Sequence, residues 1–201
     1  MPHSTTFTRR GVAALLAGAS VAAIAGPAAA LSGAEAESFI EGVVADLRKL
    51  VQAKADSDQF LTLLEQKGAV PQVGKFAMAR NWREMSDTQQ NAYQAAFRGY
   101  ISRTYAKRFG DYSGEDIIVT GSVDAGRKGV LVKSTLKNPS GQDAAVEWLV
   151  TDRLGPAKIA DIIFEGISLS ITLREVFGGM VEKRNGDIDL FIADLNASEG
   201  A

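Results

Sequence analysis

The spacing of hydrophobic residues changes along the chain and divides it into helical and strand regions. Four segments show helical spacing: residues 32–53, 57–66, 70–78 and 86–109. Ser32 is followed by Glu35, and Ser86 by Gln89, at the spacing of a capping box, which marks the start of a helix. The N-terminal half of the chain is therefore predicted to be helical.

A run of short segments rich in β-branched residues follows these helices. They are residues 117–123, 130–136, 144–151 and 159–164. Gly- and Pro-containing turns separate them, which predicts four consecutive antiparallel strands. Helical spacing returns over residues 169–182 and 188–195. Helices, then a strand meander, then helices predict an α+β fold with the helices segregated to one face of the sheet.

The first 30 residues have the features of an export signal. Arg9 and Arg10 precede an apolar run, Gly11–Gly26, that is too short to span a membrane, and Ala28–Ala30 offers a cleavage site. The adjacent arginines fit a twin-arginine signal, and a Sec signal is the alternative. We therefore expect residues 1–30 to be cleaved and residues 31–201 to form a single periplasmic domain.

Composition narrows the chemistry of residues 31–201. The whole chain has 22 Lys and Arg against 24 Asp and Glu, and removal of residues 1–30 makes the balance more acidic, which argues against nucleic-acid binding. The chain has no Cys, and its one His, His3, lies in the signal. Thiol nucleophiles, Ser-His-Asp triads and His-ligated zinc are thereby excluded from the mature domain. We expect no metal, no cofactor and no catalytic residue.

Three parts of the chain, in order, resemble one family. They are Phe76–Gly114, the strand meander, and "IADIIFEGISLSITLREVF", Ile159–Phe177. Together they resemble the MlaC family of periplasmic phospholipid-binding proteins, also called toluene-tolerance auxiliary proteins, over about residues 32–195. The positions that match the family's pattern are Trp82, Ser86, Gln89, Tyr105, Asp161, Glu165, Gly166, Ser168, Arg174 and Phe177. The family usually enters its closing strand through a Trp, where this chain has Gly155-Pro156-Ala157-Lys158.

The resemblance implies an NTF2-like fold with an apolar slot between a four-stranded sheet and the helices. It also implies a lipid carrier that is not an enzyme. Such a carrier moves phospholipid between an outer-membrane lipoprotein complex and an inner-membrane ABC transporter that bears an MCE-domain ring.

A slot for acyl chains has to be dry and apolar, and we predict which side chains form its walls. They are Phe39, Val43, Leu47, Phe76, Tyr93, Phe97, Tyr100, Ile101, Val132, Trp148, Ile162, Phe164, Ile167 and Phe177. For the aromatic residues of the segment 86–109, ordinary core packing is the alternative.

The segment from Asp161 to Arg174 is predicted to turn from a strand into a helix at the slot. Gly166 would allow a sharp turn, and Ser168 would cap the helix. By strand alternation, Asp161 and Glu165 are expected to point away from Ile162 and Phe164, as outward or rim groups, and to pair with Arg174. Shape-holding contacts alone are the alternative role for these charged residues.

Two other functions remain open. The first is a carrier of a different apolar lipid, such as a hopanoid, which would need a shorter and wider cavity. The second is an enzyme on an NTF2-like scaffold with Asp161 or Asp143 as general base, its pKa raised by burial. A cluster of Arg80, Arg83, Lys107 and Arg108 would be a basic rim for a head group or partner, or a solvated surface.

Overall fold

The computed structural model of the chain describes residues 31–110, 116–138 and 141–198, and for residues 105–110 only the backbone. The expected export signal with Arg9 and Arg10 lies outside the described residues. The side chains of Tyr105, Lys107 and Arg108 lie outside them as well, so the expected contribution of the last two to a basic rim is not described.

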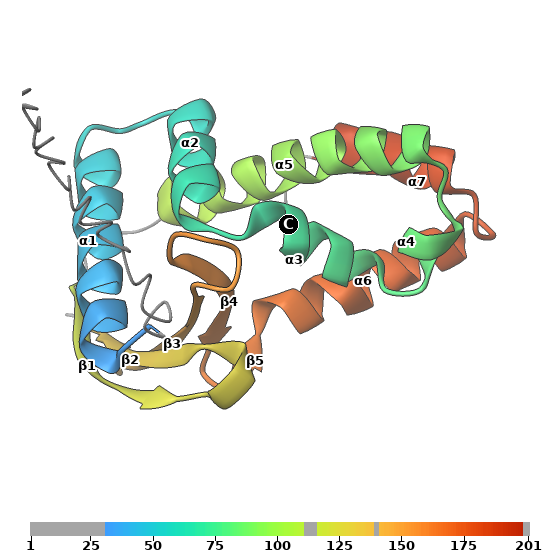
Figure 1. Cartoon of the computed structure of the whole chain (residues 1–201). Coiled ribbons are helices and arrows are strands. Elements are labelled where there is room, and N and C mark those ends of the chain that lie inside the picture. The colour runs from blue at the N-terminus through green and yellow to red at the C-terminus, as the bar shows by residue number, and fades with distance from the viewer. Residues whose placement is uncertain (1–30, 111–115, 139–140, 199–201) are drawn as a thin grey trace, which may run out of the picture.

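The described helices and strands follow the predicted order closely (Figure 1). The helices are α1 (Gly33–Gln52), α2 (Ser57–Lys67), α3 (Val70–Met78), α4 (Asn81–Glu84), α5 (Asp87–Gly110), α6 (Leu169–Lys183) and α7 (Ile188–Ala197), with one 3-10 turn, η1 (Gly126–Lys128). The strands are β1 (Ile117–Asp124), β2 (Val130–Leu136), β3 (Ala144–Thr151), β4 (Lys158–Phe164) and β5 (Ile167–Ser168).

Local hydrogen bonds explain why the helices begin where the sequence predicts. The Ser32 hydroxyl accepts from the Glu35 N–H, and the Glu35 carboxylate accepts from the Ser32 N–H at 2.9 Å. Ser86 and Gln89 form the same reciprocal pair at the start of α5. Each pair satisfies two N–H groups that a helix start leaves without an intrahelical partner. Both predicted capping boxes are confirmed.

The strands form one antiparallel sheet in the order β1-β2-β3-β4-β5. The register places Trp148 between Val132 on β2 and Ile162 on β4. Val130 and Val132 are buried, whereas Lys133 is exposed, as the two-residue period of a half-covered strand requires. The α+β class and the meander are confirmed, and the two-residue strand β5 is an addition to the four strands predicted.

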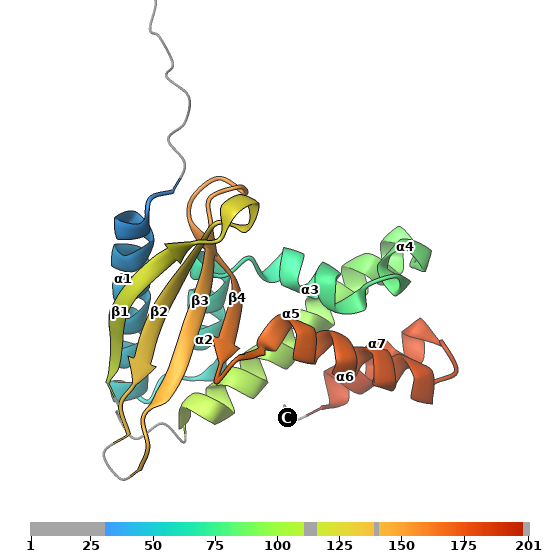
Figure 2. The same cartoon turned by 90° about the horizontal axis from the view of Figure 1, so that it is seen from below.

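The sequence analysis expected all helices to cover one face of the sheet, and the structure differs from this expectation. Helix α1 lies across β1 and β2, whereas α3 to α7 extend past the β4 edge (Figure 2). The helices α3, α5, α6 and α7 carry enough apolar surface to bury one another, so they do not need the sheet as a partner. The molecule thus has a sheet part, which includes α1, and a helical part, and a cavity can form where the two parts meet.

The hydrophobic core consequently has two centres. One lies between α1 and the sheet and contains Ile40, Val132 and Trp148. The other lies among α3, α5, α6 and α7, where Phe177 is fully buried. The Phe177 ring meets the rings of four aromatic residues at centroid distances of 5.4–6.3 Å: Tyr93, Phe97, Tyr100 and Phe191. In the part of the chain described, no helix is long and apolar enough to cross a membrane.

Candidate functional site

An apolar cavity of about 110 Å³ lies where the two core centres meet. Helix α1 contributes Val43 and Leu47, and α5 contributes Phe97 and Ile101. Strand β3 contributes Trp148, and α2, α3, β4 and α6 complete the wall. The cavity therefore lies at the boundary between the sheet part and the helical part of the molecule.

Several cavity residues are buried without belonging to either core cluster. Val43, Leu47 and Phe60 expose only 5–6% of their surface, yet none of them is a member of the two clusters formed by the described residues. Such side chains are shielded from solvent and present part of their surface to the cavity. Apolar side chains around a space of this kind would gain dispersion contacts from an apolar guest.

The predicted slot residues separate into three groups. Part of the set lines the cavity: Val43, Leu47, Phe97, Ile101, Trp148 and Ile162. Others are packed in or against the core clusters, outside the lining: Phe39, Tyr93, Tyr100, Val132 and Phe177. The last three are exposed: Phe76 (44%), Phe164 (49%) and Ile167 (66%).

The position of the aromatic residues on α5 has a physical reason. Helices α6 and α7 pack against α5, and each covers Tyr93 with one aromatic ring. The Tyr93 hydroxyl donates a hydrogen bond of 2.8 Å to the Gly74 carbonyl, and burial raises the pKa of its phenol. Phe97 and Ile101 lie nearer the C-terminal end of α5, where the cavity replaces part of this packing.

The sequence analysis did not select the cavity residues on α2, α3 and α6. Those it missed are Phe60, Leu63, Leu64, Val70, Val73, Leu169 and Leu173. Helical spacing was visible for these positions, but spacing identifies a buried face and not the neighbour that the face meets. The packing of α2 beside β4 is what brings them to the cavity.

The connection between α2 and α3 closes the cavity against β4. The Ala69 N–H donates to the Ile159 carbonyl at 2.8 Å. The Lys158 ammonium donates to the carbonyls of Glu65 and Gln66 at 3.0 and 2.6 Å. A cation at the C-terminal carbonyls of a helix is favourable. Lys158 thus supports this wall in the segment where the family usually has a Trp.

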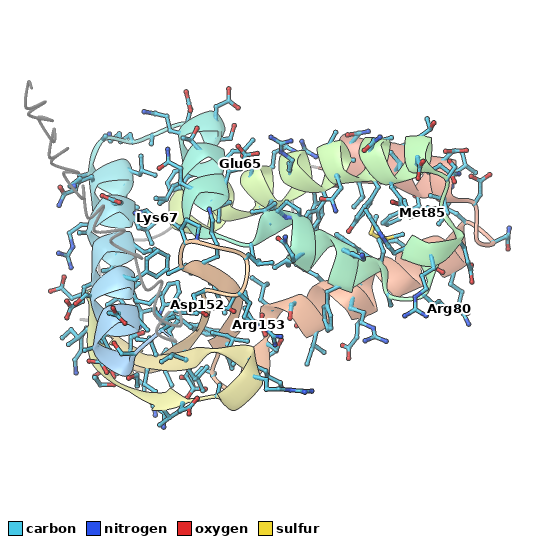
Figure 3. All side chains as sticks on the ribbon, viewed as in Figure 1. Glu65, Lys67, Arg80, Met85, Asp152 and Arg153 are labelled. Atoms are coloured by element: carbon cyan, nitrogen blue, oxygen red, sulfur yellow. The ribbon has the colours of Figure 1, made fainter. Side chains whose placement is uncertain are left out.

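Two charged side chains line the otherwise apolar cavity. The Lys67 ammonium lies 3.4 Å from the Asp46 carboxylate and 5.9 Å from the centre of the Phe39 ring. Figure 3 shows Lys67 at the end of α2, close to the loop between β3 and β4. The Lys67 side chain is 29% exposed, so at this point the apolar lining borders a charged group that is in contact with solvent.

The other charged side chain, Asp161, caps a helix. Its carboxylate accepts hydrogen bonds from the Ser168 hydroxyl at 2.5 Å and from the Ser170 N–H at 3.0 Å. The expected pair of Asp161 with Arg174 is therefore wrong, and Asp161 lies at the cavity wall and not on the outer face of the sheet. Asp161 turns toward the start of α6 because the N–H groups there need an acceptor.

The turn that joins β4 to α6 has the expected form. Gly166 has φ of +79°, which glycine adopts without strain, and the Ser168 hydroxyl accepts from the Ile171 N–H at the start of α6. The Glu165 carboxylate accepts a hydrogen bond from the Ala145 N–H, so its partner is the neighbouring strand, not Arg174 as expected.

Among the described residues there is no cluster that could hold a metal ion, and Asp143, the second candidate base, does not line the cavity. No group of three or more His, Cys, Asp or Glu among them is placed to hold a metal ion. Asp143 is exposed and lies outside the cavity lining. Its hydrogen bond from Lys137, 2.5 Å long, lowers the pKa of its carboxyl group. This shift is opposite to the one that the enzyme hypothesis needs.

Comparison with known proteins identifies a family and a solved structure of similar fold. The family model described as "MlaC protein" matches residues 38–197. Among solved structures, the chain is similar to the phospholipid-binding protein from Ralstonia solanacearum in complex with a phospholipid. The TM-score is 0.68 at 22% sequence identity, and the match covers 82% of this chain and 98% of the Ralstonia chain.

Proposed function

The chain belongs to the MlaC family, and on this premise we propose that it is a periplasmic carrier that holds phospholipid acyl chains in the cavity. The observation that carries the proposal is the apolar space of about 110 Å³ between the two core centres. The fold it shares with the Ralstonia protein, which was solved in complex with a phospholipid, supports the proposal.

The lining of the cavity suits an acyl chain because the chain has no hydrogen-bonding group. Each methylene group moved from water into such a lining contributes about 0.8 kcal/mol. A modest number of methylene groups therefore accounts for tight binding without a charged clamp. Among the lining residues, only Lys67 and Asp161 carry charge, and Asp161 is engaged in capping α6.

The size of the cavity requires its walls to move apart when lipid enters. Pockets for drug-sized ligands have volumes of roughly 300–1,000 Å³, whereas this cavity measures about 110 Å³. The two core clusters share no residue, and both contribute to the cavity wall, as Phe97 and Trp148 do. Acyl chains would separate the clusters at this boundary without breaking either one.

Lys67 marks the position of the head group in this proposal. Its ammonium is the only cation among the lining residues, and it is held near Asp46 and Phe39 at a partly exposed position. A phosphate placed there would keep contact with water and gain an ion pair, while its acyl chains follow the apolar wall toward Phe97.

The cellular part of the proposal is export and exchange between membranes. Residues 1–30 would direct the chain to the periplasm, leaving residues 31–201 as the carrier domain. There the carrier would exchange phospholipid between an outer-membrane lipoprotein complex and an inner-membrane ABC transporter with an MCE-domain ring. Replacement of Arg9 and Arg10 by Lys should block export if the signal is of the twin-arginine type, and normal processing would indicate a Sec signal.

The cavity assignment can be tested with tryptophan fluorescence, because the chain has two Trp residues and only Trp148 lines the cavity. The Trp82→Phe variant retains Trp148 as its single Trp. It would be delipidated, loaded with phosphatidylglycerol carrying brominated acyl chains, and separated from vesicles by gel filtration. We expect strong quenching of Trp148 compared with unbrominated lipid, because bromine quenches indole at short range.

The matched control is Trp148→Phe, which retains Trp82 outside the cavity and should not be quenched by the same lipid. Equal emission of Trp148 with brominated and unbrominated lipid, at equal lipid content, would show that the acyl chains lie elsewhere. Native mass spectrometry of protein purified from its host separates a phospholipid from a polycyclic lipid as the natural ligand.

A further inference from the structure

A groove of about 790 Å³ lies between α3, α4 and α6, apart from the lipid cavity. Its lining shares no residue with the cavity lining. The side chains that matter here are four cations and two aromatic rings: Lys75, Arg80, Arg83, Arg174, Phe76 and Trp82. We refer to this site as the basic groove. Figure 3 shows Arg80 at the end of the helical part that is remote from α1.

The cations of the basic groove have no carboxylate partner among the described residues. None of the four takes part in an ion pair within that part of the chain. Two of them lie over aromatic rings instead. The Lys75 ammonium is 5.7 Å from the Trp82 ring centre, and the Arg174 guanidinium is 5.5 Å from that of Phe76. These contacts hold the cations in position and leave their charge uncompensated.

The concentration of positive charge is unusual for this chain. The chain as a whole carries more acidic than basic residues, with a formal net charge of −2. Yet every charged residue that lines the basic groove is a cation. Four like charges at one site repel one another and do not help the fold. A negatively charged partner would convert this repulsion into attraction.

We propose that the basic groove binds an acidic segment of a partner protein, with an apolar or aromatic side chain of that segment placed on Phe76. Charge complementarity identifies the sign of the partner. The Phe76 ring is 44% exposed and offers the apolar contact. Arginine and aromatic residues are enriched at protein interfaces, and both are present here.

The shape of the site favours a protein segment over a membrane surface. A flat bilayer would touch the rim of a groove of this volume, whereas a side chain or helix that protrudes from a partner would enter it. The proposal does not rest on lipid binding, because the basic groove and the cavity have separate linings.

The test uses Trp82 as a reporter. In the Trp148→Phe variant, Trp82 is the only Trp and lies in the basic groove. The protein would be titrated with a synthetic peptide of repeated Glu-Glu-Phe triplets, and with a Lys-Lys-Phe peptide as the charge control. We expect the acidic peptide alone to shift the Trp82 emission, with an affinity that falls as salt is added.

Charge reversal locates the binding. In the same background, Arg80→Glu with Arg83→Glu should weaken the acidic peptide at least ~tenfold, since ~1.4 kcal/mol of lost attraction is tenfold in affinity. Arg127→Glu with Lys128→Glu is the matched control, because both residues are exposed on η1 and outside the basic groove. Circular dichroism and thermal melts check that each variant folds.

Three outcomes would overturn the proposal. They are no binding of the acidic peptide, equal loss of affinity in the two charge-reversed variants, and binding to phosphatidylglycerol vesicles that requires Arg80 and Arg83. The last would assign the basic groove to a bilayer surface. The triple variant Arg80→Glu, Arg83→Glu, Trp82→Phe separates this proposal from the lipid-carrier function. Brominated lipid is expected to quench its Trp148 as strongly as in Trp82→Phe alone.

Discussion

The Asp161 carboxylate accepts a hydrogen bond of 2.5 Å from the Ser168 hydroxyl. Its other oxygen accepts from the Ser170 N–H at 3.0 Å, in the first turn of α6. Negative charge at a helix N-terminus is favourable. One side chain therefore joins strand β4 to the helix that supplies Leu169 and Leu173 to the cavity.

Removal of this carboxylate should weaken the junction between β4 and α6. We expect Asp161→Ala to lower the free energy of unfolding by about 1–3 kcal/mol, because the Ser170 N–H and Ser168 hydroxyl lose their acceptor. Urea denaturation measures the change. Arg174→Ala is the control and should cost less than about 1 kcal/mol, since its guanidinium lies over the exposed Phe76 ring and takes part in no ion pair among the described residues. Equal losses of unfolding free energy in the two variants would instead support an ion pair between Asp161 and Arg174.

Close packing of α3 on α5 should make Gly74 sensitive to a single methyl group. A Cβ atom at Gly74 would lie 2.8 Å from Cδ1 and 3.1 Å from Cε1 of the buried Phe97 ring, so the ring or the helix would have to shift. We expect Gly74→Ala to destabilise the protein by about 1–3 kcal/mol through overpacking. Chemical denaturation of the purified variant measures this.

Gly42→Ala provides the opposite case within α1. Nothing lies within 4 Å of a Cβ atom at Gly42. This change should stabilise the protein by about 0.5–1 kcal/mol, because glycine is a poor residue for a helix interior. Similar effects of the two substitutions would disprove the packing argument.

Partial filling of the cavity should remove the stabilisation that lipid provides. A ligand that binds only the folded state raises its melting temperature. Leu64 is partly buried and lines the cavity, so Leu64→Trp would place an indole in the empty space. We expect the lipid-free variant to melt near wild type and to gain little from added phosphatidylglycerol. Thermal melts of delipidated and loaded protein give both values.

Leu190→Trp is the matched control because Leu190 is 49% exposed and lies on α7, outside the cavity. It should keep the full lipid effect. A Leu64→Trp protein that gains as much from lipid as wild type would move the binding site away from this cavity.

Cleavage after Ala30 should create a new charge contact. The Leu31 N–H donates to the Asp152 carboxylate at 3.0 Å. In a mature chain that starts at Leu31, the same nitrogen would be a charged ammonium, and the contact would become an ion pair. We expect Asp152→Asn to cost about 1 kcal/mol in the mature protein and less in the uncleaved chain. Equal costs in thermal or urea unfolding would show that processing leaves this contact unchanged.

The link between α6 and α7 should weaken in acid. Arg184 donates two hydrogen bonds of 2.6 Å to Asp194, and these bonds lower the pKa of the Asp194 carboxyl group from its ordinary value of 3.8. A lowered pKa in the folded state means that the stabilisation is present above the unfolded value and disappears as pH falls through the folded value.

Asp194→Asn should therefore make stability fall less steeply than in wild type between about pH 5 and pH 2. The measurement is the urea midpoint at a series of pH values, and parallel pH profiles would contradict the prediction. Asp189→Asn, on the same helix and outside any ion pair among the described residues, controls for the loss of a carboxylate.

Short-range patterns were sufficient to predict most elements of the fold. The capping pair of Ser32 and Glu35 and the two-residue period of β2 and β3 depend on neighbours in sequence, so they are visible without the fold. The short elements α4, η1 and β5 were missed, because each depends on the segments around it. The order of antiparallel strands followed from the turns between them.

Only the tertiary structure decided which apolar residues face the cavity. Phe97 and Phe177 look alike in sequence, yet Phe97 lines the cavity and Phe177 is enclosed by aromatic rings. Likewise, Arg174 joins Arg80 and Arg83 in the basic groove because α3 packs on α6, a contact that no local pattern encodes. Periodicity specifies that a face is buried, whereas the packing of distant elements determines what that face meets.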